Sequence, residues 1–155
     1  MQTFLPLPEF GASARCLEWR RLGKQRVECK QILNALVKKR ENIKAGWQHH
    51  PAVLMWEGYE DALCVYGYLV CEEWSRRGYR DTLRSFFISQ LTISEDVVKR
   101  PWWLGDERLH SSHRARLLQK DPTHYSQFGW REEPCGPDGY FWPGPGPTPD
   151  TQPSG

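Results

Sequence analysis

The sequence predicts a mainly α, compact single domain of about three main helices joined by long ordered loops. Apolar residues recur at spacings of three and four over long stretches, which is the period of an amphipathic helix. The length of 155 residues suits one domain that is large enough to bury a sizeable core. Only residues 79–103 leave room for a strand.

The strongest helical signal runs from Pro51 to Arg77. A proline suits the first turn of a helix, and Gly78 suits the position just past its end. Six residues at helical spacing give this segment a broad apolar stripe, namely Trp56, Tyr59, Leu63, Tyr66, Val70 and Trp74.

Two further helices are expected at residues 14–39 and 106–119. The apolar spacing of the first drifts around Gly23, which predicts a kink or a change of face there. The second is stopped before Pro122. Between the helices, "SFFISQLTI" is read as a strand or as a buried extended segment.

Composition divides the chain into a domain at residues 1–133 and a tail at residues 134–155. The tail contains "PGPGPTPDTQPSG", which is rich in proline and glycine and poor in apolar residues, so we expect it to be disordered.

No apolar run approaches 18 residues, and the first residues lack the basic-then-apolar pattern of a signal peptide. A cytoplasmic protein without a membrane partner is therefore expected. The five cysteines are odd in number and lack CxxC spacing, which favours reduced and mostly buried thiols.

Positive charge is concentrated in residues 15–44, where ten Lys or Arg and three Glu give a local charge of +7. The total is only +2, so the rest of the chain carries about −5. Such asymmetry is typical of a nucleic-acid-binding face, although a solvated helix surface gives the same pattern. The candidate phosphate contacts are Arg20, Arg26 and Lys30, with a second basic set at Arg114, Arg116 and Lys120.

Histidines and tryptophans supply further candidates for nucleic-acid contact. His49 and His50 precede the strongest helix, and His110 and His113 lie one turn apart. These histidines form hydrogen bonds or phosphate contacts in one reading and bind a divalent metal ion in another; no cofactor is assigned. The pair chosen for base stacking is Trp102 and Trp103.

Several segments together resemble the pyrimidine-dimer DNA glycosylases, the family of phage endonuclease V, over roughly residues 1–130. They are "LEWRRL", "YGYLVCEEWSRRGYRDT" and "HSSHRARLLQKDPTHYSQFG". A bacterial branch of that family is more similar, and it carries "RRLGKQRVE", "HPAVLMWEGYEDAL" and "PWWLGDERLHSSHR".

The resemblance implies a compact helical fold and a DNA-facing surface built from the first helix and the C-terminal segment, which contains Tyr125. It also implies DNA repair by glycosidic cleavage at a damaged pyrimidine in double-stranded DNA. In the family, an amine attacks the sugar, forms a Schiff base and allows AP lyase cleavage, while a carboxylate assists. Arg20 and Arg26 match the family's DNA-contacting arginines. A monomer is expected.

Two positions depart from the family's pattern. The family's amine is N-terminal on a small residue exposed by methionine removal, whereas Gln2 is too large for efficient removal, so Met1 is expected to stay. The family's catalytic glutamate falls on Arg21. We therefore consider that Lys24 replaces the amine and Glu28 the carboxylate, since the two residues are four apart on one helix face. An ordinary surface salt bridge explains the same spacing.

In this interpretation Gly23 lets a sugar-phosphate backbone approach the helix closely. Three function classes follow. The first is a DNA glycosylase and lyase with Lys24, Glu28 and Arg21 at its centre. The second is a catalytically silent nucleic-acid-binding protein. The third and weakest is a histidine-based metal-dependent enzyme.

Overall fold

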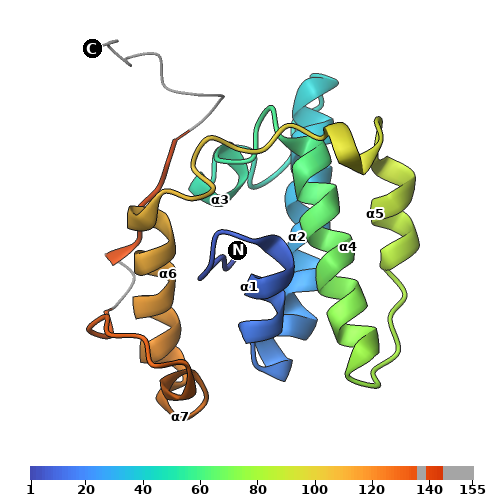
Figure 1. Ribbon diagram of the computed structural model, residues 1–155. Coiled ribbons are helices and arrows are strands. Elements are labelled where there is room, and N and C mark those ends of the chain that lie inside the picture. Colours follow the sequence, from blue (N-terminus) through green and yellow to red (C-terminus); the bar gives the residue numbers. More distant parts are fainter. Residues whose placement is uncertain (136–138, 145–155) are drawn as a thin grey trace.

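The structure is a computed structural model that describes residues 1–135 and 139–144. Within these residues it is built from helices and contains no strand, so the predicted mainly α fold is confirmed (Figure 1). None of the helices described is both long and apolar enough to cross a membrane. In chain order they are α1 (Phe10–Cys16), α2 (Trp19–Arg40), α3 (Pro51–Leu54), α4 (Glu60–Arg76), α5 (Arg84–Gln90), η1 (Glu95–Val97), α6 (Glu107–Lys120), α7 (Pro122–Tyr125) and η2 (Ser126–Phe128).

The helix expected from residue 14 is two helices, because Leu17 is extended with a ψ of 136° and separates α1 from α2. Glu18 then caps α2, and its side chain accepts a hydrogen bond from the Arg21 N–H. From Trp19 onward α2 runs through Gly23 without interruption.

The helix expected at residues 51–77 is also divided. α3 ends at Leu54, and α4 begins only at Glu60. Gly58 has a φ of +87°, which breaks the helical path. Pro51 does occupy the first turn of α3, and Gly78, with a φ of +96°, follows the end of α4 as expected.

The segment "SFFISQLTI", expected as a strand or a buried extended chain, is helical over residues 85–90 and non-helical over residues 91–93. α5 packs against α4, and the ring of Phe87 fills the space beside Gly67, where a Cβ would lie 2.6 Å from it. This approach leaves no room for a side chain at residue 67 and fixes α5 on the outer side of α4 (Figure 1).

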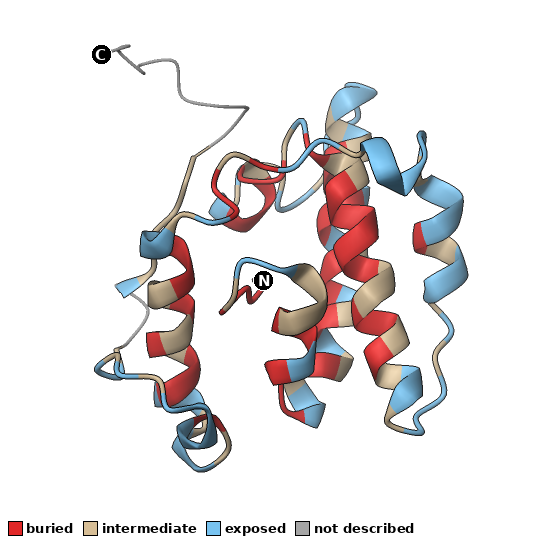
Figure 2. Ribbon diagram, in the orientation of Figure 1, coloured by how far each residue is buried: buried red, intermediate tan, exposed pale blue. Residues whose placement is uncertain are grey.

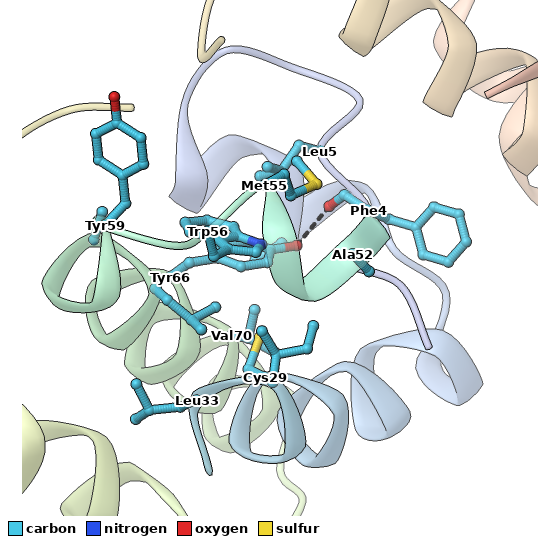
Figure 3. Close-up of a cluster of buried hydrophobic side chains, with 14 of the residues drawn as sticks. Phe4, Leu5, Cys29, Leu33, Ala52, Met55, Trp56, Tyr59, Tyr66 and Val70 are labelled. Carbon is cyan, nitrogen blue, oxygen red and sulfur yellow. Dashed lines mark hydrogen bonds between the residues drawn. The ribbon is translucent and has the colours of Figure 1, made fainter. Parts of the chain in front are cut away.

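The N-terminal segment, defined here as residues 1–6, lies between α6 on one side and α1, α2 and α4 on the other (Figure 1). Residues 2–6 of it are buried (Figure 2). The core beside it is aromatic: Trp56 stacks on Tyr66 at 6.3 Å and meets Trp103 edge-on at 4.9 Å. The Tyr66 hydroxyl donates a 2.5 Å hydrogen bond to the Phe4 carbonyl (Figure 3).

All five cysteines are free thiols, and four of them are buried, which confirms the expectation from their number and spacing. Burial raises the pKa of the Cys64 thiol to about 12, so it stays protonated at neutral pH.

Part of the expected tail packs on the domain. Tyr140, Phe141 and Trp142 lie against the core, and the Phe141 N–H donates to Ser112 Oγ at 3.1 Å. Residues 136–138 and 145–155, which include most of "PGPGPTPDTQPSG", lie outside the described residues. The boundary at residue 133 stays a prediction.

Candidate active site around the N-terminal segment

A cavity of about 670 Å³ opens where the N-terminal segment meets the first half of α2 and the end of α6. Residues 20, 24 and 28 of the α2 wall lie on one helix face, because they follow at intervals of four. The whole wall consists of the N-cap Glu18 and of Trp19, Arg20, Arg21, Lys24 and Glu28.

The remaining walls come from three other parts of the chain. The N-terminal segment contributes Met1, Gln2 and Phe4. Facing α2 are Arg116 and Lys120 of α6, together with Asp121 and with Tyr140 of the C-terminal segment.

The N-terminal segment is held by side chains that bind its main chain. The Gln25 amide accepts a hydrogen bond from the Phe4 N–H and donates one to the Gln2 carbonyl, both at 2.8 Å. The Trp56 indole N–H donates to Thr3 Oγ1 at 3.0 Å. The two bonds to Gln25 satisfy main-chain groups that no helix pairs, and the bond from Trp56 holds a side chain of the segment.

The carboxylate of Glu28 lies beside an amine, but that amine is not Lys24. The N-terminal nitrogen of Met1 lies 3.5 Å from Glu28 Oε2. Lys24 is exposed on the rim of the same cavity. The structure thus brings both predicted residues to one site and pairs Glu28 with an amine that the sequence reasoning had set aside.

Arg21 is tied to Glu18 rather than free in the cavity. Its guanidinium lies 2.8 Å from Glu18 Oε1, which also accepts a 3.0 Å hydrogen bond from the Tyr125 hydroxyl. Burial alone would raise the pKa of Glu18, and the hydrogen bonds from Arg21 and Tyr125 outweigh burial and lower it. Tyr125 is fully buried, so the expectation that it contacts nucleic acid is corrected.

Four cations surround the cavity mouth: Arg20, Lys24, Arg116 and Lys120. Among these four side chains, Lys120 has a pKa that is lowered by its surroundings. Burial lowers the pKa of its ammonium group first, and the charges of Arg116, Arg21 and Lys24 lower it further. This crowding of positive charge creates a strong attraction for anions at the cavity.

Arg26 and Lys30 do not belong to this rim. Arg26 forms a 2.6 Å ion pair with Asp81 and lies over the Trp74 ring, with 4.9 Å between guanidinium carbon and ring centroid. Burial alone would raise the pKa of Asp81, but the hydrogen bonds that its carboxylate accepts, of which the one from Arg26 contributes most, and the Arg26 charge together outweigh burial and lower that pKa. Lys30 lies 4.9 Å from the Phe86 ring centroid. Both side chains contact residues on the α4–α5 side of α2, so the expected row of phosphate contacts is not brought together with the cavity rim, and contact of these two residues with phosphate stays a prediction.

The histidine candidates divide in a similar way. His110 and His113 are 1 % and 0 % exposed and bind the main chain of Leu5, so they do not reach a surface. His50 caps α3 through a 3.0 Å hydrogen bond from the Ala52 N–H. His49 is exposed outside the cavity lining. Among the described residues, no group of three or more His, Cys, Asp or Glu side chains is arranged to hold a metal ion.

The remaining candidates, Trp102, Trp103 and Arg114, make contacts within the protein. Trp103 is fully buried and donates from its indole N–H to the Met55 carbonyl at 2.9 Å, so it cannot stack on a base. Trp102 is half-buried against the core. Arg114 binds Glu132 at 2.8 Å and also donates to the Pro6 carbonyl at 2.8 Å.

Several residues of the site were not among the candidates from the sequence, and Trp19, Gln25 and Tyr140 illustrate why. Trp19 is 54 % exposed at the cavity rim with the Arg20 guanidinium 5.3 Å from its ring centroid, and its position beside Arg20 was an available signal. Gln25 and Tyr140 gave none, because neither has a motif or spacing that marks it.

The family model described as pyrimidine dimer DNA glycosylase matches residues 1–85. The chain belongs to this family. Its general function is therefore that of a DNA glycosylase in DNA repair, and its substrate is DNA. A search of curated proteins and a search of solved structures gave no match. The matched residues of this glycosylase include the N-terminal segment and all of α2, whereas Arg116, Lys120 and Tyr140 lie beyond the match.

Proposed function

We propose that this protein is a DNA glycosylase with AP lyase activity that attacks damaged pyrimidine nucleotides in double-stranded DNA through an amine in the cavity. The observation that carries the proposal is the 3.5 Å approach of the Met1 amine to Glu28, inside a cavity lined by cations. An amine beside a carboxylate is the pair that Schiff-base chemistry at a sugar carbon requires.

The Met1 amine is the better placed of the two candidate nucleophiles. It contacts Glu28 directly, whereas Lys24 lies exposed on the rim. Retention of methionine does not remove the amine from the site, because the nitrogen that meets Glu28 is that of Met1 itself. Lys24 then serves as a phosphate-binding cation, and Arg21 fixes Glu18 at the start of α2.

The reaction begins with a neutral amine. Its lone pair forms a bond to C1′ of the sugar while the glycosidic bond breaks and leaves its electrons on the base. Glu28 takes a proton from the new ammonium group and passes it to the leaving base. The nitrogen lone pair then opens the sugar ring, and O4′ takes up one proton from solvent, which leaves a cationic imine. Loss of a C2′ proton and of the 3′ phosphate completes strand cleavage.

Binding of DNA is assigned to the cavity rim. Arg20, Lys24 and Lys120 are exposed cations that can contact phosphates on both sides of an extrahelical nucleotide. Trp19 offers an exposed ring for base stacking at the same edge. The rim forms within one chain, so the proposed glycosylase acts as a monomer.

Borohydride trapping on abasic DNA tests the proposal. The expected adduct maps to the peptide that begins with residue 1, whose identity is read by intact mass. Lys24→Ala retains the adduct, Glu28→Gln slows glycosylase-dependent trapping on lesion-containing DNA, and one added residue before Met1 abolishes trapping.

An adduct that maps to Lys24 would reassign the amine and leave the glycosylase proposal standing. Failure of the protein to form an adduct with any abasic or lesion-containing DNA, while still binding it, would replace the proposal by a catalytically silent DNA-binding protein.

A further inference from the structure

Leu5 is bound on both of its main-chain polar groups by imidazoles from one face of α6. Its N–H donates to His113 Nδ1 at 2.9 Å, and its carbonyl oxygen lies 2.7 Å from His110 Nδ1. His110 Nε2 accepts in turn from the Gly105 N–H at 2.8 Å. Two histidines one helical turn apart thus act on Leu5 as a neighbouring strand would.

These contacts determine the state of both rings. Because His113 Nδ1 accepts a hydrogen bond, its proton is on Nε2. Because His110 Nε2 accepts, its proton is on Nδ1 and is donated to Leu5. Burial lowers the pKa of both imidazoles, to about 3 for His113, so both are neutral at physiological pH. A neutral imidazole presents one donor and one acceptor, which is what the two main-chain groups need.

The opposite side of the N-terminal segment is held by α2. Gln25 binds the main chain of Gln2 and Phe4, and Glu28, three residues further along α2, meets the Met1 amine. The segment is therefore fixed from two helices. Leu5 is four positions after Met1, so the two lie at most roughly 13 Å apart along the chain, and a displacement of the Leu5 main chain can be passed along this short segment to the amine beside Glu28.

We propose that His110 and His113 are positioning residues for the attacking amine, acting through the main chain of Leu5. The inference rests on the proposed function for its chemical meaning. In this inference the two histidines align the amine with Glu28, and they do not contact DNA.

Asparagine and leucine variants test this assignment, because an asparagine side chain places its amide near the Nδ1 position of histidine. His113→Asn keeps an acceptor for the Leu5 N–H, and His110→Asn keeps a donor for the Leu5 carbonyl. His113→Leu and His110→Leu keep bulk and lose the hydrogen bond. His124→Leu is the matched control, since His124 Nε2 bonds to the Cys16 carbonyl at 2.8 Å and not to the main chain of Leu5.

Two readouts separate positioning from mere stability. The first is the rate at which acetic anhydride labels the N-terminal amine of the folded protein without DNA, compared with a free peptide of the same sequence. The second is the single-turnover rate of borohydride trapping at saturating enzyme, set beside the affinity for DNA that carries a stable abasic analogue.

The leucine variants are expected to label at the rate of the free peptide and to lose about 100-fold in trapping rate, the cost of a misplacement of roughly 1 Å, with affinity within about twofold of wild type. The asparagine variants are expected to keep most of the protection of the amine from labelling and most of the trapping rate. His124→Leu is expected to change neither the labelling rate nor the trapping rate. Should the leucine variants not fold, His113→Gln and His110→Gln, which place the amide near Nε2, take their place.

Unchanged labelling of the amine in folded variants would overturn the inference. Absence of trapping in the wild type would instead remove the proposed function, and the labelling rates would still decide whether the two histidines position the amine.

Discussion

The ring of Trp74 fills the space beside Gly23, so that a Cβ at residue 23 would lie 2.8 Å from Trp74 Cη2. Trp74 cannot easily retreat. Its indole N–H donates to the Arg80 carbonyl at 3.1 Å, and the ring stacks on Tyr79 at 4.2 Å. The glycine therefore serves the packing of α2 on α4 and not the approach of a sugar-phosphate backbone.

Gly23→Ala is accordingly expected to lower the free energy of unfolding. Overpacking costs about 1–3 kcal/mol, against which alanine regains about 1 kcal/mol of helix propensity. Denaturant titration measures the change, and Gly46→Ala, where a Cβ meets nothing within 4 Å, is the control. A stable variant with weakened DNA binding would restore the sequence-based interpretation.

The three exposed rim cations should account for much of the salt dependence of DNA binding. Replacing Arg20, Lys24 and Lys120 by alanine is expected to weaken affinity and to reduce the log–log salt slope by about 0.9 for each lost phosphate contact. Fluorescence anisotropy over a salt series measures the slope. The control replaces Arg40, Lys44 and Arg80, which are exposed and do not line the cavity. If the two triple variants lose affinity and salt slope equally, the rim has no special role in DNA binding.

Trp19 should contribute to binding by stacking. Trp19→Ala is expected to cost about 1–3 kcal/mol of affinity for DNA with an extrahelical nucleotide. Trp47→Ala tests an equally exposed tryptophan that lies outside the cavity lining, and it should bind as the wild type does. Equilibrium titration compares the two, and a loss shared by both variants would argue against a local stacking role.

His113 should make stability depend on pH. Its pKa is about 3 in the folded protein against an ordinary value of 6.5, so below pH 6.5 the unfolded chain binds a proton that the folded protein does not. The contribution of His113 to the free energy of unfolding is fully present above pH 6.5. It falls by about 1.4 kcal/mol per pH unit as the pH drops from 6.5 toward 3. Urea titrations at several pH values measure the slope, and His113→Asn should flatten it. Parallel profiles would contradict the assignment.

The sequence predicted the long helical stretches because their apolar periods are long, although two of the three expected helices are each divided in the structure. It did not reveal the break between α3 and α4, since Trp56 and Tyr59 are buried in the break and continue the apolar pattern across it. α5 was misread because a helix of seven residues is too short for its period to be distinguished from an extended segment.

For the site, charge and spacing found the cations of both helical walls, including Arg116 and Lys120 of α6, and missed the contacts that hold the N-terminal segment. Arg20, Lys24 and Glu28 follow one helix face, which a pattern can show. The role of His113 depends on Leu5, which is 108 residues away in sequence, and on a main-chain group that every residue type carries. Arg26 looked like a phosphate contact because its partner Asp81 lies 55 residues further along the chain.

The span between Leu5 and His113 also sets the order in which the molecule can be assembled during synthesis. At about 5–20 residues per second, the ribosome needs roughly 5–20 s to add the 108 residues between them. During that interval α1, α2 and α4 are made in turn, but the first residues have no α6 to close over them until the interval ends. The cavity is therefore completed only after α6 and Tyr140 have been made, although the N-terminal segment, which forms one of its walls, is the first part of the chain to be made.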